Sequence, residues 1–312
     1  MSVAANVESK KMKKIAILAS DNMMPDTKEQ RADFFERDEQ MGKLIPAFKA
    51  RDMALELLPW RGCAQKASAY EAILPLFVWD YFEGNEAEFM SEMAKLAGQT
   101  LLLNPLETLA WNAKKTYLED LKAKGAPVID TLLLDRVTQN NVMRALGMFE
   151  TKSLVIKPQI GGGAWRQVLW HEGETFPDED SLPPKGALVQ PFLPSVLEEG
   201  EYSFLYFGGQ FSHGLIKRPK QGDYRIQSIY GGREVAYTPT QEDLKTARDI
   251  LDSLDFIPLY ARIDLLRGRD GELKLIELEM IEPYLYLAFA QGEGADNKGA
   301  QKLAAALAKQ LT

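Results

Sequence analysis

The chain has 312 residues, 46% of them hydrophobic and 26% charged, which is the composition of an ordinary globular protein. Its 45 acidic and 37 basic side chains give a net charge of −8, which argues against a broadly basic surface that binds nucleic acid. One cysteine, Cys63, excludes an internal disulfide framework and a cysteine-rich zinc site, and the length favours about two domains or one elaborated domain.

No apolar run approaches the roughly 20 residues that a membrane-spanning helix needs. Lysines at positions 10, 11, 13 and 14 precede a short apolar stretch at 15–19, but Asp21 follows it without a convincing cleavage site. We therefore interpret this stretch as a first strand behind a frayed tail. We predict a cytoplasmic protein that contacts neither membrane nor nucleic acid.

The first hundred residues alternate between apolar runs and amphipathic segments. The apolar runs, typical of buried parallel strands, are 15–20, 55–60, 73–79 and 101–103. Between them, residues 27–50 carry apolar side chains at roughly helical spacing, and residues 86–97 are typical of a helix. This alternation predicts a parallel α/β domain, which ends at the Asn104-Pro105 turn.

The rest of the chain mixes helices with strands that form hairpins. Helices are expected at 108–124, through 144–146, at 240–254 and at 297–311. Strands are expected at 154–158, 187–192, 202–207, 210–216, 260–267 and 273–280. The acidic, proline-rich segment 171–186 is expected to be a solvated loop.

Three carboxylates occur in the last predicted hairpin. Glu277 and Glu279 lie two residues apart, which places them on the same face of a strand whose neighbours are apolar. Such a pair repels unless positive charge lies between the two groups, and Asp264 on the facing strand can add a third oxygen ligand. Hard oxygen ligands of this kind suit Mg²⁺. The alternative is a solvent-facing acidic face paired with Arg262 or Lys274.

Two further motifs combine basic side chains with glycines whose backbone an anion can approach closely. Lys157 ends a strand that leads into Gly161, Gly162 and Gly163, whose backbone N–H groups can approach a phosphate closely; the alternative is a flexible hairpin tip. Lys217, Arg225 and Arg233, with Gly231 and Gly232, suit a developing phosphoryl or carboxylate charge; the alternative is a solvated surface.

The order of these motifs resembles that of ATP-grasp enzymes of the glutathione synthetase and ribosomal-protein glutamate ligase type. It runs from Lys115 to Lys157 with its glycines, Val-Gln-Pro-Phe-Leu-Pro at 189–194, Gly-Glu at 200–201, Lys217, Arg225, Gly-Gly, Asp264, Glu277 and Glu279. Three stretches are also similar to the D-cycloserine-forming (O-ureido-D-serine) cyclo-ligases and their relatives. They are Trp79-Asp80-Tyr81, residues 111–118 and residues 276–283.

The resemblance implies an α/β fold, α+β in its C-terminal part, of the ATP-grasp type. It implies an N-terminal parallel α/β pre-ATP-grasp domain at 1–106, a small central ATP-binding domain at 107–190, and a C-terminal domain at 191–312 with the metal and catalytic site. The implied cofactors are ATP and Mg²⁺, with Mn²⁺ as an alternative. The implied partners are small-molecule carboxylates and amines, and the resemblance also allows a homodimer.

The resemblance also assigns roles to residues. The ATP site would comprise Lys115 and Lys157 on the phosphates, Gly161, Gly162 and Gly163 as a flap, Val189, Gln190, Pro191 and Phe192 beside adenine, and Glu201 on the ribose. The catalytic group would comprise Lys217, Arg225, Gly231 and Gly232. The Mg²⁺ ligands would be Asp264, Glu277 and Glu279.

The implied activity is ATP-dependent, ADP-forming ligation of a carboxylate to an amine through an acyl phosphate, on a small amino-acid-like substrate. The alternatives are an intramolecular cyclo-ligase, a ligase that modifies peptides or proteins, and a non-catalytic nucleotide-binding protein. The intact charged positions argue against the last. Leu76-Phe77-Val78 stands where close relatives commonly have polar residues, so the ureido-serine substrate is not carried over. Cys63 and His213 are expected to be structural, and so is Trp165 unless it touches ligand.

Overall fold

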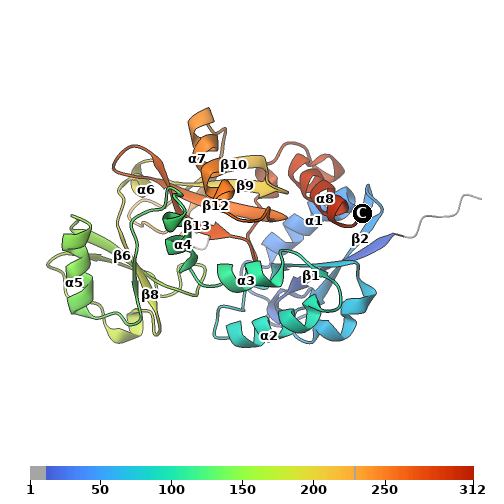
Figure 1. Ribbon diagram of the computed structural model, residues 1–312, viewed down its shortest axis with the longest axis horizontal. Coiled ribbons are helices and arrows are strands. Elements are labelled where there is room, and N and C mark those ends of the chain that lie inside the picture. Colours follow the sequence, from blue (N-terminus) through green and yellow to red (C-terminus); the bar gives the residue numbers. More distant parts are fainter. Residues whose placement is uncertain (1–11, 228–229) are drawn as a thin grey trace, which may run out of the picture.

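The computed structural model describes residues 12–227 and 230–312. Within these ranges the strands form three sheets that follow one another along the long axis of the molecule (Figure 1). The sheet from the first third of the chain is parallel, and the other two are antiparallel. The predicted combination of a parallel α/β part with an α+β C-terminal part is therefore confirmed.

The N-terminal sheet has the strand order β2-β1-β3-β4. Its elements are β1 (Lys13–Ala19), α1 (Phe35–Lys49), β2 (Met53–Pro59), β3 (Ala72–Phe77), α2 (Glu86–Ala97) and β4 (Leu101–Leu102). Residues 15–19 of the central strand are completely buried, because helices cover both faces of this sheet. Helix α1 begins only at Phe35, after a series of turns and bends over residues 25–34.

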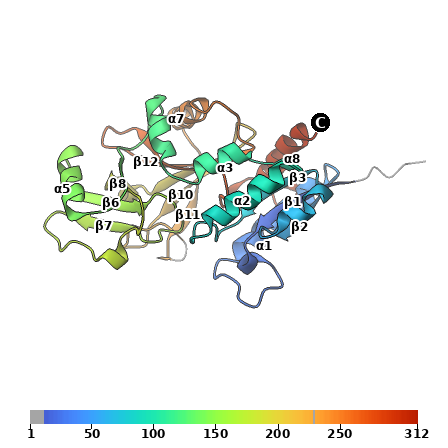
Figure 2. The same cartoon turned by 60° about the horizontal axis from the view of Figure 1, so that its bottom comes forward.

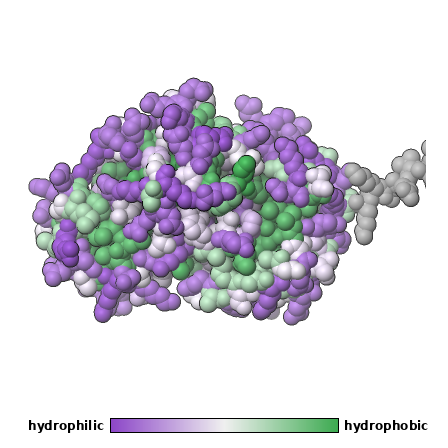
Figure 3. Space-filling model, viewed as in Figure 1, coloured by the Kyte–Doolittle hydropathy of each residue, from purple (hydrophilic) through white to green (hydrophobic). Residues whose placement is uncertain are grey.

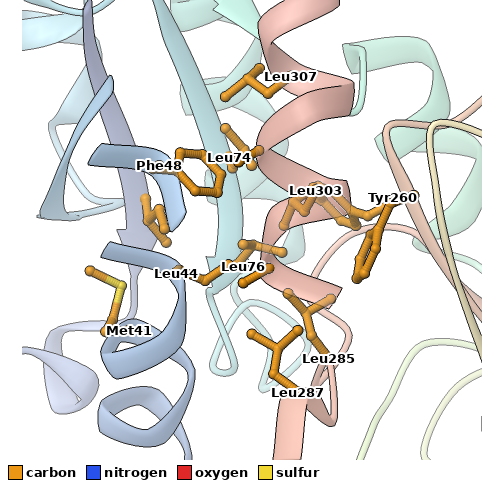
Figure 4. Packing of buried hydrophobic residues seen from close by; sticks show 14 of the residues in the cluster. Met41, Leu44, Phe48, Leu74, Leu76, Tyr260, Leu285, Leu287, Leu303 and Leu307 are labelled. Carbon is orange, nitrogen blue, oxygen red and sulfur yellow. The ribbon is translucent and has the colours of Figure 1, made fainter. Parts of the chain in front are cut away.

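One face of the N-terminal sheet is covered by α1 together with the last helix of the chain, α8 (Lys298–Gln310). Leu44 and Phe48 of α1, Leu74 and Leu76 of β3, and Leu303 of α8 pack together in one core (Figure 4). The opposite face packs against α2. The last helix therefore anchors the N-terminal sheet, and β9 (Glu201–Phe207) and β10 (Gln210–Arg218) of the C-terminal sheet also contact α8.

The predicted helix at 108–124 is wrong as a single element. The structure has two helices, α3 (Leu106–Asn112) and α4 (Tyr117–Ala123), with a break between them. The break has a tertiary cause, because the backbone N–H of Lys115 donates to the carbonyl of Gln159 at 2.8 Å instead of to a helical partner. This interruption turns Lys115 towards the middle of the molecule.

The central sheet has the order β5-β8-β6-β7 and lies at the opposite end of the molecule from the N-terminal sheet (Figure 2). Its elements are β5 (Leu132–Leu134), α5 (Gln139–Met148), β6 (Ser153–Pro158), β7 (Val168–His171) and β8 (Ala187–Pro191). Helix α5 begins at a capping box formed by Thr138 and Asn141 and packs on the sheet through Val142 and Ala145. Strands β5 and β7 were not expected from the sequence.

The C-terminal sheet has the order β11-β10-β9-β12-β13. Its elements are α6 (Ser195–Glu198), β9 (Glu201–Phe207), β10 (Gln210–Arg218), β11 (Arg233–Tyr237), α7 (Gln241–Asp252), β12 (Tyr260–Arg267) and β13 (Leu273–Glu279). The two expected hairpins, β9–β10 and β12–β13, are confirmed. Strand β11 was not expected.

Hydrophilic residues are spread over the face of the molecule seen in Figure 3, with hydrophobic residues in several separate patches between them. No helix in the described part of the chain has the length and apolar character that crossing a bilayer would require. The three-domain division remains a prediction.

Candidate active site

A cavity of about 1030 Å³ lies where the three sheets meet. Part of its lining is apolar and comes from the central and C-terminal sheets and their connections, namely Ile129, Val155, Phe192, Leu193, Leu266 and Ile276. Another part comes from helix α1 and from the turns before it and after β3, namely Arg31, Asp33, Glu36, Trp79, Phe82 and Glu83. Charged side chains of both signs line the space between them, so the cavity suits a large polar ligand.

The predicted carboxylate triad converges in this cavity. Asp264 of β12 lies opposite Glu277 of β13 in the hairpin register, and Glu279 follows on the same face. Carboxylate oxygens of the three residues lie within 4.8 Å of one another. Burial and the neighbouring Glu277 raise the pKa of Glu279 to about 7, although Arg262 opposes this shift. Three carboxylates whose oxygens lie this close together in a cavity fit a divalent cation such as Mg²⁺.

Arg262 is a site residue that the sequence interpretation missed as a functional group. Its guanidinium binds both oxygens of Asp264 at 2.9–3.1 Å and also donates to Glu279. Although burial alone would raise it, Arg262 and Lys217 lower the pKa of Asp264 to about 2. The alternative of an acidic face paired with Arg262 is thus half right, because the pairing exists but is buried. Lys274 instead pairs with Asp270 at 2.7 Å.

The two predicted phosphate lysines face the cavity from different elements. Lys115, in the break between α3 and α4, lies 3.0 Å from Glu277 Oε1 and donates to the carbonyl of Gly161. Lys157 lines the cavity from β6 and has no salt-bridge partner among the described residues. Burial lowers the pKa of Lys157, and the nearby Glu277 and Glu201 oppose that shift. An unpaired ammonium in a cavity fits an anionic ligand.

Lys217 and Glu201 form a buried ion pair in the same wall. The Nζ of Lys217 lies 2.5 Å from Glu201 Oε1 and 3.3 Å from Asp264 Oδ1. Although burial disfavours its charge, these two carboxylates raise the pKa of Lys217, so its ammonium is permanent at neutral pH. Glu201, expected to bind ribose, is thus already held by Lys217.

The predicted flap and the segment predicted to lie beside adenine both border the cavity. Gly161, Gly162 and Gly163 line it, and so do Gln190, Pro191 and Phe192. The side chain of Val189 points away into the core of the central sheet, which leaves only its backbone for ligand contact. Gln190 is held by a hydrogen bond from its Nε2 to Thr131 Oγ1 at 3.0 Å.

The predicted basic cluster does not form one group. Arg225 lines the cavity but pairs with Asp223 at 2.7 Å and stacks 3.8 Å above the Tyr230 ring. Arg233 is exposed and lies outside the lining. Gly231 and Gly232 are not in the lining either. A Cβ on Gly232 would lie 1.9 Å from the carbonyl oxygen of Ile226, so only glycine fits there.

Two sequence motifs that lie far apart meet beside the cavity. The indole Nε1 of Trp79 donates to the backbone carbonyl of Glu282 at 3.0 Å, which ties residues 79–81 to residues 276–283. Asp80 is buried and accepts hydrogen bonds from Trp60 Nε1 and Arg61 Nη1, both at 2.7 Å. These contacts fix the turn over residues 78–85 against the C-terminal sheet.

The remaining conspicuous residues behave mainly as expected. Burial raises the pKa of the Cys63 thiol to about 12 and lowers the pKa of His213 to about 4, so both are neutral structural groups at pH 7. Trp165 differs, because it is exposed and lines the cavity beside the glycines. No local sequence pattern marked Arg31, Glu36, Phe82 or Tyr284, which reach the cavity only through tertiary packing.

The chain resembles proteins of known identity along most of its length. Residues 15–104 match the family model described as D-cycloserine synthetase DcsG, N-terminal domain. The chain is 26% identical over 294 residues to the cycloserine biosynthesis protein DcsG of Streptomyces lavendulae. This match covers 88% of this chain and 94% of that protein. It is 32% identical over 207 residues to the glutathione synthetase of Prochlorococcus marinus (strain MIT 9313), which covers 61% of this chain and 60% of that protein.

Solved structures agree with this picture. The crystal structure of D-cycloserine synthetase DcsG matches with a TM-score of 0.81 and 24% identity, over 96% of this chain and all of that one (100%). D-alanine–D-alanine ligase from Bacillus anthracis complexed with ATP matches with a TM-score of 0.63 and 14% identity, over 96% of this chain and 97% of that one. Other matching structures are described as ATP-grasp proteins.

These matches confirm the predicted resemblance and the ATP-grasp fold. The chain is homologous to the cycloserine biosynthesis protein and to glutathione synthetase, which also confirms the predicted class of enzyme, an ATP-dependent ligase that forms C–N bonds.

Proposed function

We propose that the protein is an ATP- and Mg²⁺-dependent ligase that joins a carboxylate to an amine through an acyl phosphate. The convergence of Asp264, Glu277 and Glu279 with Lys115 and Lys157 in one cavity carries this proposal. Carboxylates are poor electrophiles, so attack by nitrogen requires an activated acyl group. A site that gathers metal ligands and ammonium groups suits transfer of the terminal phosphoryl group to a carboxylate, since such catalysis consists mainly of positioning and charge stabilisation.

The chain's own residues would divide this work. Asp264, Glu277 and Glu279 would hold Mg²⁺, which when bound would neutralise charge on the phosphates; Mn²⁺ offers the same coordination chemistry. Lys115 and Lys157 would contact phosphate oxygens, and residues 161–163 would cover them. Glu201 would face the ribose beside the apolar wall for adenine, where Val189, Gln190, Pro191 and Phe192 would offer backbone groups. Lys217 and Arg225, which line the cavity, would stabilise the carboxylate under attack.

The acid-rich part of the lining supports a substrate that carries an amino group. Glu36, Glu234 and Glu282 line the cavity from different segments, and none has a salt-bridge partner among the described residues. Burial raises the pKa of each of these carboxyls, and a substrate ammonium would reverse that shift. The proposed substrate is therefore a small amino-acid-like molecule. Because the enzyme would consume ATP, the proposal also fits a cytoplasmic location.

Cyclisation within one molecule is the second candidate. The specific observation in its favour is the match to the cycloserine biosynthesis protein over most of the chain. In such a reaction the carboxylate and the attacking nitrogen would belong to one substrate. A polypeptide acceptor has weaker support.

The test is a screen for carboxylate-dependent release of ADP by the purified protein, with and without added amines. We expect one class of amino-acid-like carboxylate to give ADP together with a new C–N bond, detected by mass spectrometry. A product that needs no added amine would assign cyclisation. Glu277→Ala is the inactive control. ADP release that no carboxylate stimulates, or that survives in Glu277→Ala, would contradict the proposal.

A further inference from the structure

The glycine flap is in direct contact with a phenyl ring from the N-terminal part of the chain. Phe82 lies in the turns between β3 and α2, and its ring stands against the backbone of Gly162. A Cβ built on Gly162 would lie 2.9 Å from Phe82 Cζ and 3.0 Å from Cε1, closer than side chains approach one another. Both residues line the cavity. The ring thus occupies the space that a side chain at position 162 would need.

The position of Phe82 is set by its own turn. Tyr81 is buried in the N-terminal core, with its ring centre 5.4 Å from that of Phe82. The side chain of Asn85 and the N–H of Glu83 both donate to the carbonyl of Asp80, at 2.9 and 3.1 Å. These bonds fix the backbone of the turn that carries Phe82, so the ring projects from a defined position.

The flap is held from other sides as well. Lys115 donates to the carbonyl of Gly161, and a Cβ on Gly161 would meet Pro158 at 2.8 Å. After the glycines, Ala164 and Arg166 have positive φ angles of 59° and 49°, which cost free energy in residues with side chains. Such a conformation persists only where surrounding contacts impose it. Phe82 supplies the contact from the N-terminal part.

We infer that Phe82 is a positioning residue: its ring is the stop against which the flap closes, and position 162 is glycine because a side chain there would meet that ring. This inference rests on the proposed function. The closed contact would join the flap to the wall that carries Arg31, Glu36 and Trp79, and would keep water from the acyl phosphate. Loss of the ring would therefore favour hydrolysis over ligation.

A double-mutant cycle tests the contact itself. Amide hydrogen exchange of residues 160–166 is measured in wild type, Phe82→Ala, Gly162→Ala and the double variant, with and without the ATP analogue AMPPNP and Mg²⁺. We expect each single variant to exchange roughly 2- to 10-fold faster than wild type, in the lower part of the range for residues in contact. The double variant should exchange more slowly than Gly162→Ala, because removing the ring removes the clash. Phe82→Leu should retain most of the protection.

Matched controls separate this effect from general destabilisation. Gly147→Ala is the glycine control, since a Cβ there meets nothing within 4 Å, and Phe256→Ala in an exposed loop is the phenylalanine control. Both should leave flap exchange unchanged. Strictly additive effects in the cycle, or a Gly162→Ala variant equal to Gly147→Ala, would overturn the inference. If AMPPNP bound and protected the flap equally in wild type and Phe82→Ala, the proposed function would stand and this inference would fall.

An activity measurement adds a readout that a purely structural role would not move. Once a substrate is known, Phe82→Ala should raise the ratio of ADP released to ligated product severalfold, with the Kd for AMPPNP little changed. Phe82→Leu should restore tight coupling. An unchanged ratio in Phe82→Ala would overturn the role in excluding water.

Discussion

The ammonium of Lys115 lies 3.0 Å from the Oε1 of Glu277 and joins the break between two helices to the last strand of the C-terminal sheet. One of the proposed phosphate ligands is therefore paired with one of the proposed metal ligands. When ATP and Mg²⁺ bind, the Lys115 ammonium would pair with the phosphates and the Glu277 carboxylate with Mg²⁺. This pairing suggests that the site is organised around a metal–polyphosphate ligand.

Substitutions in the triad should abolish turnover without unfolding the protein. Glu277→Ala and Glu279→Ala each remove an oxygen ligand from Mg²⁺. Both side chains are partly exposed to the cavity, at 27% and 25%, so the cost in stability should be small. Glu272→Ala, on the exposed turn of the same hairpin, is the control. Near wild-type ATP turnover by both variants at saturating Mg²⁺ would make the metal assignment wrong.

Lys157 should contribute to nucleotide affinity rather than to folding. Because it has no salt-bridge partner among the described residues, Lys157→Met should leave the melting temperature almost unchanged. It should weaken ATP binding by about 1.5–3 kcal/mol, the range for a hydrogen bond to a charged group. Isothermal calorimetry measures this loss, with the exposed Lys152→Met as control. Unchanged affinity and unchanged rate would contradict the role.

The sequence predicted much of this site because its chemistry follows local geometry. The two-residue period placed Glu277 and Glu279 on one face, and the hairpin brought Asp264 opposite them. Arg262 could have been found in the same way, since the register places it opposite Glu279. The break at Lys115 could not, because its cause is a hydrogen bond to Gln159, which is distant in sequence.

The part of the cavity wall that is proposed to bind substrate could not be predicted from the sequence, for a similar reason. Phe82 lies in a turn without a periodic pattern, and the helical pattern around Glu36 does not say what the polar face of that helix meets. They reach the cavity because α8 and the Trp79–Glu282 contact fix the N-terminal sheet beside the C-terminal one. Those contacts join residues from opposite ends of the chain, and no local pattern encodes them.

Glu36 should make substrate binding depend on pH. Burial and neighbouring acids raise its pKa to about 7 in the folded protein. Its carboxylate therefore forms as the pH rises through about 7, and the KM for an amino-group substrate should fall over that interval. Glu36→Gln should weaken this dependence and raise KM at pH 8 by roughly tenfold, equal to one ion pair of about 1.4 kcal/mol. A KM profile identical to that of wild type would contradict this contact.

Asp80 should stabilise the fold in a pH-dependent manner. Burial alone would raise its pKa, but hydrogen bonds from Arg61 and Trp60 lower it below the usual value. A carboxyl with a lowered folded pKa contributes stability above its unfolded pKa, and this contribution is lost as the pH falls through the folded value. Asp80→Asn should therefore lower the free energy of unfolding by about 1–3 kcal/mol at pH 7.

The difference between wild type and Asp80→Asn should narrow in acid. Urea unfolding at pH 7 and near pH 3 measures it. Asp270→Asn, which removes an exposed acid paired with Lys274, should cost little at either pH. Equal stability of Asp80→Asn and wild type at pH 7 would show that the charge of Asp80 does not stabilise the fold.

The fate of the carboxylate oxygen tests the central claim most directly. Substrate labelled with oxygen-18 in its carboxylate is converted with ATP, and the phosphate released is analysed by mass spectrometry. An acyl-phosphate intermediate transfers one labelled oxygen to inorganic phosphate, with ADP as the other product. We predict that result. Release of AMP and pyrophosphate, with the label in AMP, would contradict the acyl-phosphate mechanism and the site assignment that depends on it.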